Sequence, residues 1–394
     1  MYICATQGEA PAPYRLKSSS LQLYSIEEAL YHTYHNWMQV GEEFLEEGFL
    51  EWLKSRLGLL ELAEGLTRLR TAPSLKDKLA GFLSYNGYFN ADELDSLTNA
   101  VYLWENQHVW EQLKKQGDYL FTKAAYPQAI ESYAAALAHV DDAKADSRAN
   151  IYSNIGISHM HMGHYDKAAT SLKKAITISP KRPYYYHLIE AHILAENYEQ
   201  ARGILDSRLE HDEHEAYYFY GQWHSSKKQY FEAIKMYQKA IDMHYDAGYI
   251  YELCKAFIKI RLYDRAFATL EQVQEKDSMF YRKQAEFYAQ TNNYPLAIKS
   301  TERAIFYDNK NAELWTYLAY LRRLDYDLGA ARGAISTALS LAPDSARSLL
   351  EQARIRKAQG RTKDYQQILD GLLTQFKQDY RAKEDYDTNK GASI

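Results

Sequence analysis

The sequence predicts an all-α protein that consists mainly of a solenoid of helical hairpins, with a small helical module in front of it. Three observations lead to this prediction. A Tyr-x-x-Ala element recurs along the chain of 394 residues, apolar residues flank each copy at helical spacing, and small residues recur at the same two places in the copies. A sequence period of about 20–50 residues is typical of stacked repeat units. We therefore expect each copy to be one such unit.

The repeated element sets the extent of the solenoid. Copies begin at Tyr126, Tyr165, Tyr198, Tyr230, Tyr263 and Tyr294, and further copies begin at Leu328 and Thr362, so that neighbouring copies are 31 to 39 residues apart. A second apolar stripe lies upstream of each copy, and both stripes place large apolar residues at i, i+3, i+4 and i+7, which is the helical period. We therefore expect about eight helical hairpins in residues 108–380, the last of them a degenerate cap.

Small residues mark the places where the two helices of a hairpin approach each other closely. A larger side chain at such a crossing would push the helices apart, because interiors are densely packed. In the second helix these residues are Ala129, Ala168, Ala201, Ala233, Ala266, Ala297 and Ala331, and in the first helix they are Gly117, Gly156, Gly221, Cys254, Ala285, Ala319 and Ala353. Pro180 and Pro343 follow two second helices, where a residue without an N–H can end a helix.

The chain outside the solenoid divides into three further segments. Residues 25–107 are expected to form a module of about five helices, since Ser25 with Glu28 and Asn90 with Glu93 have the spacing of a capping box. Residues 1–24 are expected to be extended, with a short strand near residues 2–5. Residues 381–394 are expected to be a frayed tail.

Composition and charge exclude several classes of function. The formal net charge is −5, whereas nucleic-acid binding usually requires a basic face. Cys4 and Cys254 are the 2 cysteines, and this low content fits a reducing compartment. The N-terminus lacks the basic and apolar regions of a secretion signal, and no run of about 18 apolar residues could span a membrane. These features predict a cytoplasmic protein with neither nucleic-acid nor membrane partners.

No residue set predicts catalysis or metal binding. The histidines that lie close in sequence are His159 with His161 and His164, His211 with His214, and His32 with His35. The first group does not share a helix face, because neighbours on a helix are i+3 and i+4, the second lies in a charged linker, and the third fits an ordinary helix. No P-loop, H-E-x-x-H or G-x-S-x-G motif occurs. Cys254 stands at a helix crossing and should be buried and unreactive. We expect no enzyme activity, cofactor or metal.

The repeat resembles that of the tetratricopeptide repeat family. One copy contains Trp-x-x-Leu-Ala at Trp315, Leu318 and Ala319, with Pro343 closing it, and residues 156–180 contain Gly…Tyr-x-x-Ala-x-x-x-Leu-x-x-Ala…Pro. The resemblance implies a right-handed superhelix. It also implies that the concave face, lined by the first helix of each hairpin, binds an extended peptide or a partner helix.

Counting from the small residue of each first helix identifies the side chains expected to line this groove. They are Lys114, Asn154, Tyr186, Tyr218, Phe219, Gln222, Tyr251, Lys255, Arg282, Lys283, Tyr317 and Tyr320. Tyrosine presents apolar area and a hydroxyl group, which suits a binding surface; the alternative is that these tyrosines only pack between helices. The expected function is a non-catalytic scaffold or adaptor that binds a protein or peptide segment of acidic or aromatic character. Self-association stays open.

A bacterial peptide-sensing regulator is an alternative, because it resembles this layout of a helical module followed by repeats. Such a regulator would need a DNA-reading helix or a protein-binding bundle in residues 25–107. That segment is acidic at its centre, between Glu42 and Glu51, and contains no helix rich in the residues that read DNA. DNA binding is therefore disfavoured, whereas binding of a response regulator stays open.

A chaperone-associated co-factor is a second alternative. Related repeats of that class hold a terminal carboxylate with Lys and Asn side chains and a basic pair. Lys114 and Asn154 match part of this pattern, but Asp118 stands where Asn is usual, and Pro183 and His187 replace the basic pair. The extra acid and the missing cations would repel a carboxylate, so the clamp is expected to be incomplete.

Overall fold

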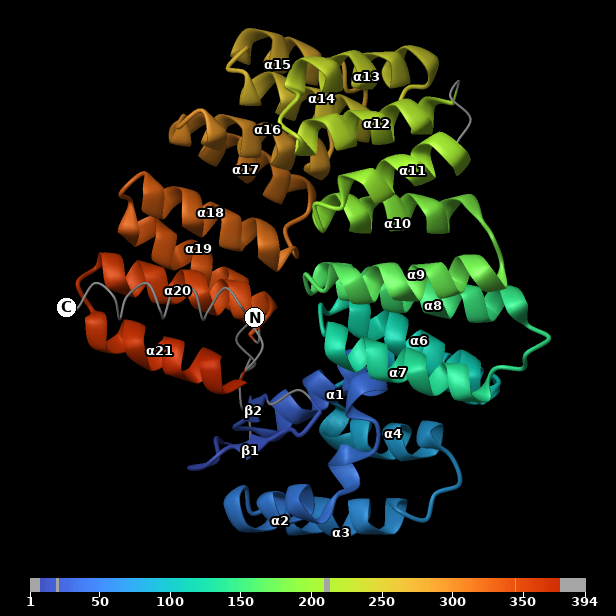
Figure 1. The fold of residues 1–394 in the computed structure, drawn as a ribbon. Helices are drawn as coiled ribbons and strands as arrows, with labels where there is room; N and C mark the ends of the chain where they lie inside the picture. Colours follow the sequence, from blue (N-terminus) through green and yellow to red (C-terminus); the bar gives the residue numbers. More distant parts are fainter. Residues whose placement is uncertain (1–7, 19–20, 209–212, 344, 376–394) are drawn as a thin grey trace. The chain divides into compact units, whose positions relative to one another are not determined.

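The computed structural model describes residues 8–18, 21–208, 213–343 and 345–375 (Figure 1). Within these ranges the chain forms 21 α-helices, and the only sheet there is a pair of two-residue strands, so the predicted all-α fold is confirmed. Contacts divide the chain into two compact units, Ile3–Leu209 and Glu210–Ile394. We call them the N-terminal body and the C-terminal body. The strand expected near residues 2–5 and the tail expected at 381–394 lie outside the described residues.

The N-terminal body begins with a helical module that has its own hydrophobic core. Its helices are α1 (Ile26–Val40), α2 (Glu47–Arg56), α3 (Leu60–Leu69), α4 (Leu75–Leu83) and α5 (Ala91–Glu105), with 3-10 helices at Glu43–Leu45 and Tyr85–Gly87. Both expected capping boxes form: Ser25 and Glu28 begin α1, and Asn90 and Glu93 begin α5. The rings of Phe44 and Phe82 stack at 4.8 Å inside the core.

The segment before α1 is more ordered than the sequence predicts. Strands β1 (Tyr14–Arg15) and β2 (Gln22–Leu23) pair antiparallel. The ring of Tyr14 meets Phe49 edge-on at 5.1 Å, and Nε1 of Trp52 donates a hydrogen bond to the carbonyl oxygen of Ala12 at 3.0 Å. Strands of two residues are too short to leave an alternating pattern, so these contacts were not predictable from periodicity.

Helix α1 also contacts the first helix of the repeat array. Asn36 has non-helical dihedral angles inside α1, which frees carbonyl groups of the helix. Side chains of α6 (Val109–Thr122) satisfy this region: the hydroxyl of Tyr119 donates to Oδ1 of Asn36 at 2.6 Å, and Nε2 of Gln116 donates to the carbonyl oxygen of Met38 at 3.0 Å. The module is therefore bonded to the array within the N-terminal body.

Eight helical hairpins follow, which we number repeats 1 to 8, each with a first and a second helix. Repeats 1 to 3, in the N-terminal body, are α6 with α7 (Tyr126–His139), α8 (Ala145–His161) with α9 (Tyr165–Ile178), and α10 (Arg182–Leu194) with α11 (Tyr198–Arg208). Repeats 4 to 8, in the C-terminal body, are α12 (His214–Ser226) with α13 (Tyr230–Met243), α14 (Ala247–Lys259) with α15 (Tyr263–Leu270), α16 (Ser278–Gln290) with α17 (Tyr294–Tyr307), α18 (Ala312–Leu324) with α19 (Leu328–Leu341), and α20 (Ala346–Ala358) with α21 (Thr362–Gln375). First helices of some neighbouring repeats within one body also touch, as α18 and α20 do.

The small residues stand at the predicted helix crossings. A Cβ atom added to Gly221 would lie 2.5 Å from the ring of Tyr237, closer than the packed interior tolerates. Cys254 is fully buried, as predicted, its Sγ donates to the carbonyl oxygen of Ala266 at 3.2 Å, and burial raises its pKa to about 12. Repeat 3 differs, because Ile189 fills the corresponding place and is fully buried there.

One residue with left-handed backbone angles closes the turn of every hairpin. These residues are Ala124, Gly163, Glu196, Lys228, Arg261, Asn292, Tyr326 and Gly360, with φ between 57° and 75°. The N–H of the following residue bonds to the carbonyl oxygen five positions back, for example Gln229 to His224 at 2.9 Å and Asp327 to Arg322 at 2.9 Å. This bond is the mark of a Schellman motif, which satisfies the last carbonyl groups of the first helix.

Candidate functional site

The predicted groove residues divide between the two bodies. Lys114, Asn154 and Tyr186 lie in the N-terminal body, on α6, α8 and α10. The other nine lie on first helices of the C-terminal body: Tyr218, Phe219 and Gln222 on α12, Tyr251 and Lys255 on α14, Arg282 and Lys283 on α16, and Tyr317 and Tyr320 on α18. The C-terminal body therefore holds the largest set within one compact unit.

Aromatic rings and polar groups are linked on α12 and α14. The ring of Tyr218 stacks on that of Tyr249 at 4.6 Å, and its hydroxyl accepts a hydrogen bond from Nε2 of Gln222 at 2.8 Å. The hydroxyl of Tyr249 in turn pairs with Nδ1 of His214 at 3.0 Å. Tyr218 is thus half-buried and held in one orientation by its neighbours.

Phe219 and Tyr251 need correction as groove residues. Only 8% of Phe219 and 7% of Tyr251 is exposed. Tyr251 belongs to the core of repeats 4 and 5, where burial, followed by the charge of Asp277, raises its pKa to about 12. Counting along a helix indicates which way a side chain points, but not how deeply neighbouring helices bury it. For these two residues, packing between helices is the observed role.

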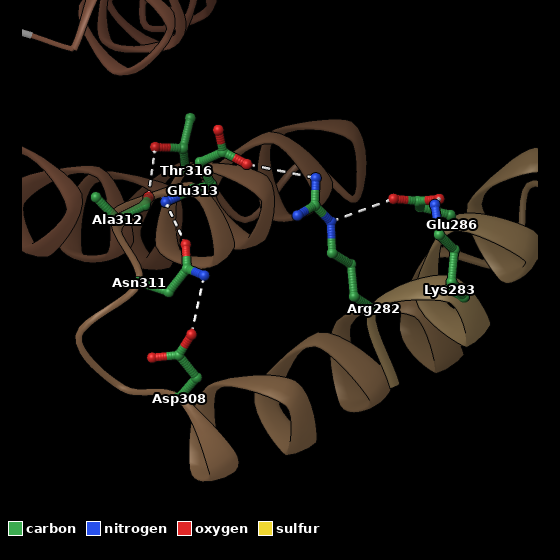
Figure 2. Close-up of polar contacts among 8 residues, drawn as sticks. All are labelled: Arg282, Lys283, Glu286, Asp308, Asn311, Ala312, Glu313 and Thr316. Atoms are coloured by element: carbon green, nitrogen blue, oxygen red, sulfur yellow. Dashed lines mark hydrogen bonds and ion pairs between the residues drawn. The ribbon is translucent and has the colours of Figure 1, made fainter. Parts of the chain in front are cut away.

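The basic residues of α14 and α16 are paired with carboxylates. Nζ of Lys255 lies 2.5 Å from Glu252, and Nζ of Lys283 lies 2.9 Å from Glu286. Arg282 contacts two carboxylates, Glu286 at 3.3 Å on its own helix and Glu313 at 3.4 Å on α18 (Figure 2). Each of these three cations therefore already has a carboxylate partner within the chain.

A capped helix start positions Glu313 for this contact. Oδ1 of Asn311 accepts the N–H of Glu313 at 3.1 Å, and Nδ2 of Asn311 donates to Asp308 at 2.9 Å (Figure 2). Asn311 is the N-cap of α18, where a side-chain acceptor satisfies an N–H that has no helical partner. Arg282 consequently links the first helices of repeats 6 and 7.

The tyrosines of α18 form a second aromatic pair on the same series of helices. The rings of Tyr317 and Tyr320 stack at 5.8 Å, and the guanidinium group of Arg323 lies 5.5 Å from the ring centre of Tyr320. Nε of Arg323 donates to Glu351 of α20 at 2.6 Å, and only 3% of Glu351 is exposed. Burial, followed by the charge of Glu286, raises the pKa of Tyr317.

Asp118 satisfies the clamp-like residues of the N-terminal body. Its carboxylate lies 2.8 Å from Nζ of Lys114, accepts from the hydroxyl of Tyr133 at 2.9 Å, and accepts from Nδ2 of Asn154 at 3.1 Å. Lys181, near the missing basic pair, forms an ion pair with Asp146 at 2.9 Å. A second carboxylate arriving here would meet the negative charge of Asp118.

The histidine groups show ordinary packing where they are described. His161 stacks on Tyr126 at 5.0 Å, and burial lowers the pKa of His159. His211 lies outside the described residues. Across the described ranges, no three side chains among His, Cys, Asp and Glu are placed to hold a metal ion. Also within these ranges, no helix has both the length and the apolar character that a membrane span requires.

Comparison with known proteins identifies the repeat. Tetratricopeptide repeat models match residues 149–182, around α8 and α9, and residues 214–246, which contain α12 and α13. The crystal structure of yeast Tom70 resembles the chain with a TM-score of 0.54 at 17% identity, over 92% of this chain and 88% of that one. The chain therefore contains tetratricopeptide repeats. A tetratricopeptide repeat protein from Parabacteroides merdae also matches, with a TM-score of 0.44 at 16% identity over 59% of this chain and 91% of that one.

No curated protein matches the chain as a relative. The matched tetratricopeptide repeats support a role as a protein-interaction scaffold in general, because repeats of this kind bind protein or peptide partners and are typically non-catalytic.

Proposed function

We propose that this tetratricopeptide repeat protein is a non-catalytic scaffold that binds a partner segment on the first helices of the C-terminal body. The surface in question, which we call the first-helix surface, consists of Tyr218, Gln222, Lys255, Arg282, Lys283, Tyr317 and Tyr320. The observation that supports it best is the set of stacked, half-buried tyrosines on α12 and α18, with partly exposed ion pairs on α14 and α16 between them.

Physical chemistry favours such a surface for binding. Tyrosine side chains that neighbours already hold in place lose little conformational entropy when a partner arrives. The stacked rings offer apolar area, and their hydroxyl groups offer hydrogen bonds. Side-chain exposure of 40% for Lys255 and 31% for Arg282 leaves both cations within reach of a partner. A segment with aromatic or acidic residues suits these groups.

The test compares affinity capture by the intact chain and by a triple variant, Tyr218→Ala with Lys255→Ala and Arg282→Ala. A matched control replaces one aromatic residue, one Lys and one Arg on second helices: Phe231→Ala, Lys299→Ala and Arg332→Ala, all exposed. We expect a partner, identified by mass spectrometry, that the control retains and the triple variant loses at equal helicity. Equal capture by all three proteins would contradict the proposal.

The donors around Asp118 do not favour the chaperone-associated alternative. Lys114, Asn154 and Tyr133 already bind a carboxylate from the chain itself, so a terminal carboxylate of a partner would have to displace it. We also propose that the interaction takes place in the cytoplasm, which the presence of only 2 cysteines supports.

A further inference from the structure

The charge of the first helices changes along the C-terminal body. In repeats 4 and 5, α12 and α14 together carry two Lys or Arg residues and two Glu residues. In repeats 6 to 8, α16, α18 and α20 together carry eight Lys or Arg residues and three Glu residues. The whole chain has a formal net charge of −5, so this positive excess is local. Such an excess attracts anionic groups.

Arg347 is an arginine of this region that has no carboxylate partner among the described residues. Arg282 contacts Glu286 and Glu313, and Arg323 is held by Glu351. Arg347, the second residue of α20, is exposed and forms no ion pair with any described residue. Its guanidinium group therefore remains available for an external carboxylate, which it can bind through two parallel hydrogen bonds.

Tyr317 lies on α18, next to the point where that helix contacts the start of α20 and Arg347. Burial and the charge of Glu286 raise the pKa of Tyr317, while Arg282 from α16 and Arg347 from α20 act on the same group in the opposite direction. Two contacts place these residues in one region. The hydroxyl groups of Thr316 and Ser348, the chain neighbours of Tyr317 and Arg347, are 2.7 Å apart, and Arg282 pairs with Glu313, which lies one helical turn before Tyr317. The hydroxyl of Tyr317 forms no hydrogen bond within the described part of the chain. A donor hydroxyl with no acceptor among the described residues therefore shares this region with cations of repeats 6 and 8.

We propose that Arg347 and Tyr317 bind a carboxylate group of the partner segment, with Arg282 as a second cation nearby. This inference rests on the proposed function, because it assigns one contact of the same partner. The carboxylate accepts from the guanidinium group of Arg347 and from the hydroxyl of Tyr317. The stacked rings of Tyr317 and Tyr320 then contact an apolar or aromatic residue next to that acid.

The experiment begins with selection of random 12-residue peptides on the immobilised full-length chain. Each selected peptide is synthesised in three versions. One has an amidated C-terminus, one has its Asp or Glu residues changed to Asn or Gln, and one has a free C-terminus. Fluorescence anisotropy then gives Kd for the unmodified chain, Arg347→Gln and Tyr317→Phe. Arg332→Gln, an exposed arginine of α19, is the matched control.

We expect the change from acid to amide in the peptide to weaken binding to the unmodified chain by about tenfold or more, as for a charge-assisted hydrogen bond. On Arg347→Gln the same change should have little effect, so that the two changes are coupled. Tyr317→Phe should weaken binding of the acidic peptide, and Arg332→Gln should leave it unchanged. Coupling seen only with a free C-terminus would identify the terminal carboxylate as the ligand, and coupling with the amidated peptide would identify a side chain.

Two results separate the failure of this inference from the failure of the proposed function. If selected peptides lose binding on Tyr218→Ala but their acid shows no coupling to Arg347, the first-helix surface binds peptides and the carboxylate site is wrong. If selection yields no peptide that depends on the first-helix surface, both proposals fail.

Discussion

Left-handed residues close the eight hairpins, and six of the eight carry a side chain. An L-residue in this conformation costs about 1–2 kcal/mol, which Gly avoids at the expense of greater freedom in the unfolded chain. Tyr326 has φ of 63° and is 90% exposed, so its side chain contributes little packing. We expect Tyr326→Gly to stabilise repeat 7 by about 0.5–1 kcal/mol. Hydrogen exchange measured by mass spectrometry in peptides from α18 and α19 should slow by about twofold to fivefold.

Gly163, which holds the corresponding position in repeat 2 with φ of 74°, supplies the reverse experiment. Gly163→Ala adds a side chain in open space but in a strained conformation. Faster exchange in α8 and α9 is expected by a similar factor. Unchanged exchange in both variants would show that the turns tolerate left-handed angles without strain.

His32 makes stability depend on pH. Burial, with the nearby charge of Lys123, lowers its pKa from 6.5 to about 4. Between pH 6.5 and about 4, the folded protein therefore keeps His32 neutral, whereas the same residue in the unfolded chain binds a proton. The stabilising effect is fully present above pH 6.5 and is lost as pH falls toward 4, by up to about 3 kcal/mol. In His32→Gln, the melting temperature of the N-terminal body should fall less between pH 6.5 and 4 than in the unmodified chain. An identical fall in both proteins would contradict the low pKa.

The candidate site shows which residue-level features the sequence could predict. The register of the small residues placed Tyr218 and Arg282 on first helices, because the helical period is local. The same counting included Phe219 and Tyr251, whose burial depends on neighbouring helices. It omitted Glu313 and Arg347, although counting back six residues from Ala319 and Ala353 reaches both. The pairing of Arg282 with Glu313 joins two repeats and leaves no local signal.

At the scale of the helical pair, the tight crossing is the feature that packing enforces most strongly. A Cβ at position 221 would lie 2.5 Å from Tyr237, which is itself 1% exposed and unable to move outward freely. We expect Gly221→Ala to destabilise repeat 4 by about 1–3 kcal/mol, as overpacking usually does. The measurement is hydrogen exchange in peptides from α12 and α13.

Gly333→Ala in α19 is the matched control, since nothing lies within 4 Å of a Cβ there. Alanine is the better helix former, so this variant should slow exchange in α19, with a gain of up to about 1 kcal/mol. If both variants destabilise alike, the effect at Gly221 does not arise from the crossing.

Helical pairs were predictable because each is specified within about 34 residues by periodicity and small residues. The two-residue strands β1 and β2 were not, because Tyr14 of β1 packs against Phe49 and Trp52, which lie far along the chain. The turn residues were missed for a different reason. Most of them are not glycine, and the bond to the carbonyl group five residues back, rather than composition, holds their conformation.

At the scale of the whole molecule, the chain divides into two bodies between Leu209 and Glu210. Repeat proteins are held together by contacts between adjacent units, so part of an array can fold without the rest. Every residue of the first-helix surface, and Arg347, lies in the C-terminal body. The division therefore leads to a test that separates binding from the role of the N-terminal module.

A fragment of residues 210–394 should be helical and melt cooperatively. It should bind peptides selected on the full chain with a Kd within about threefold of the full-chain value, which corresponds to a difference in binding free energy of less than about 1 kcal/mol. Circular dichroism and fluorescence anisotropy would measure this, with residues 1–209 as the companion fragment, which should not bind these peptides. A fragment 210–394 that folds but fails to bind would show that the N-terminal body contributes contacts. Binding by residues 1–209 alone would move the partner site to that body, where Asp118 already occupies the donors of repeats 1 and 2.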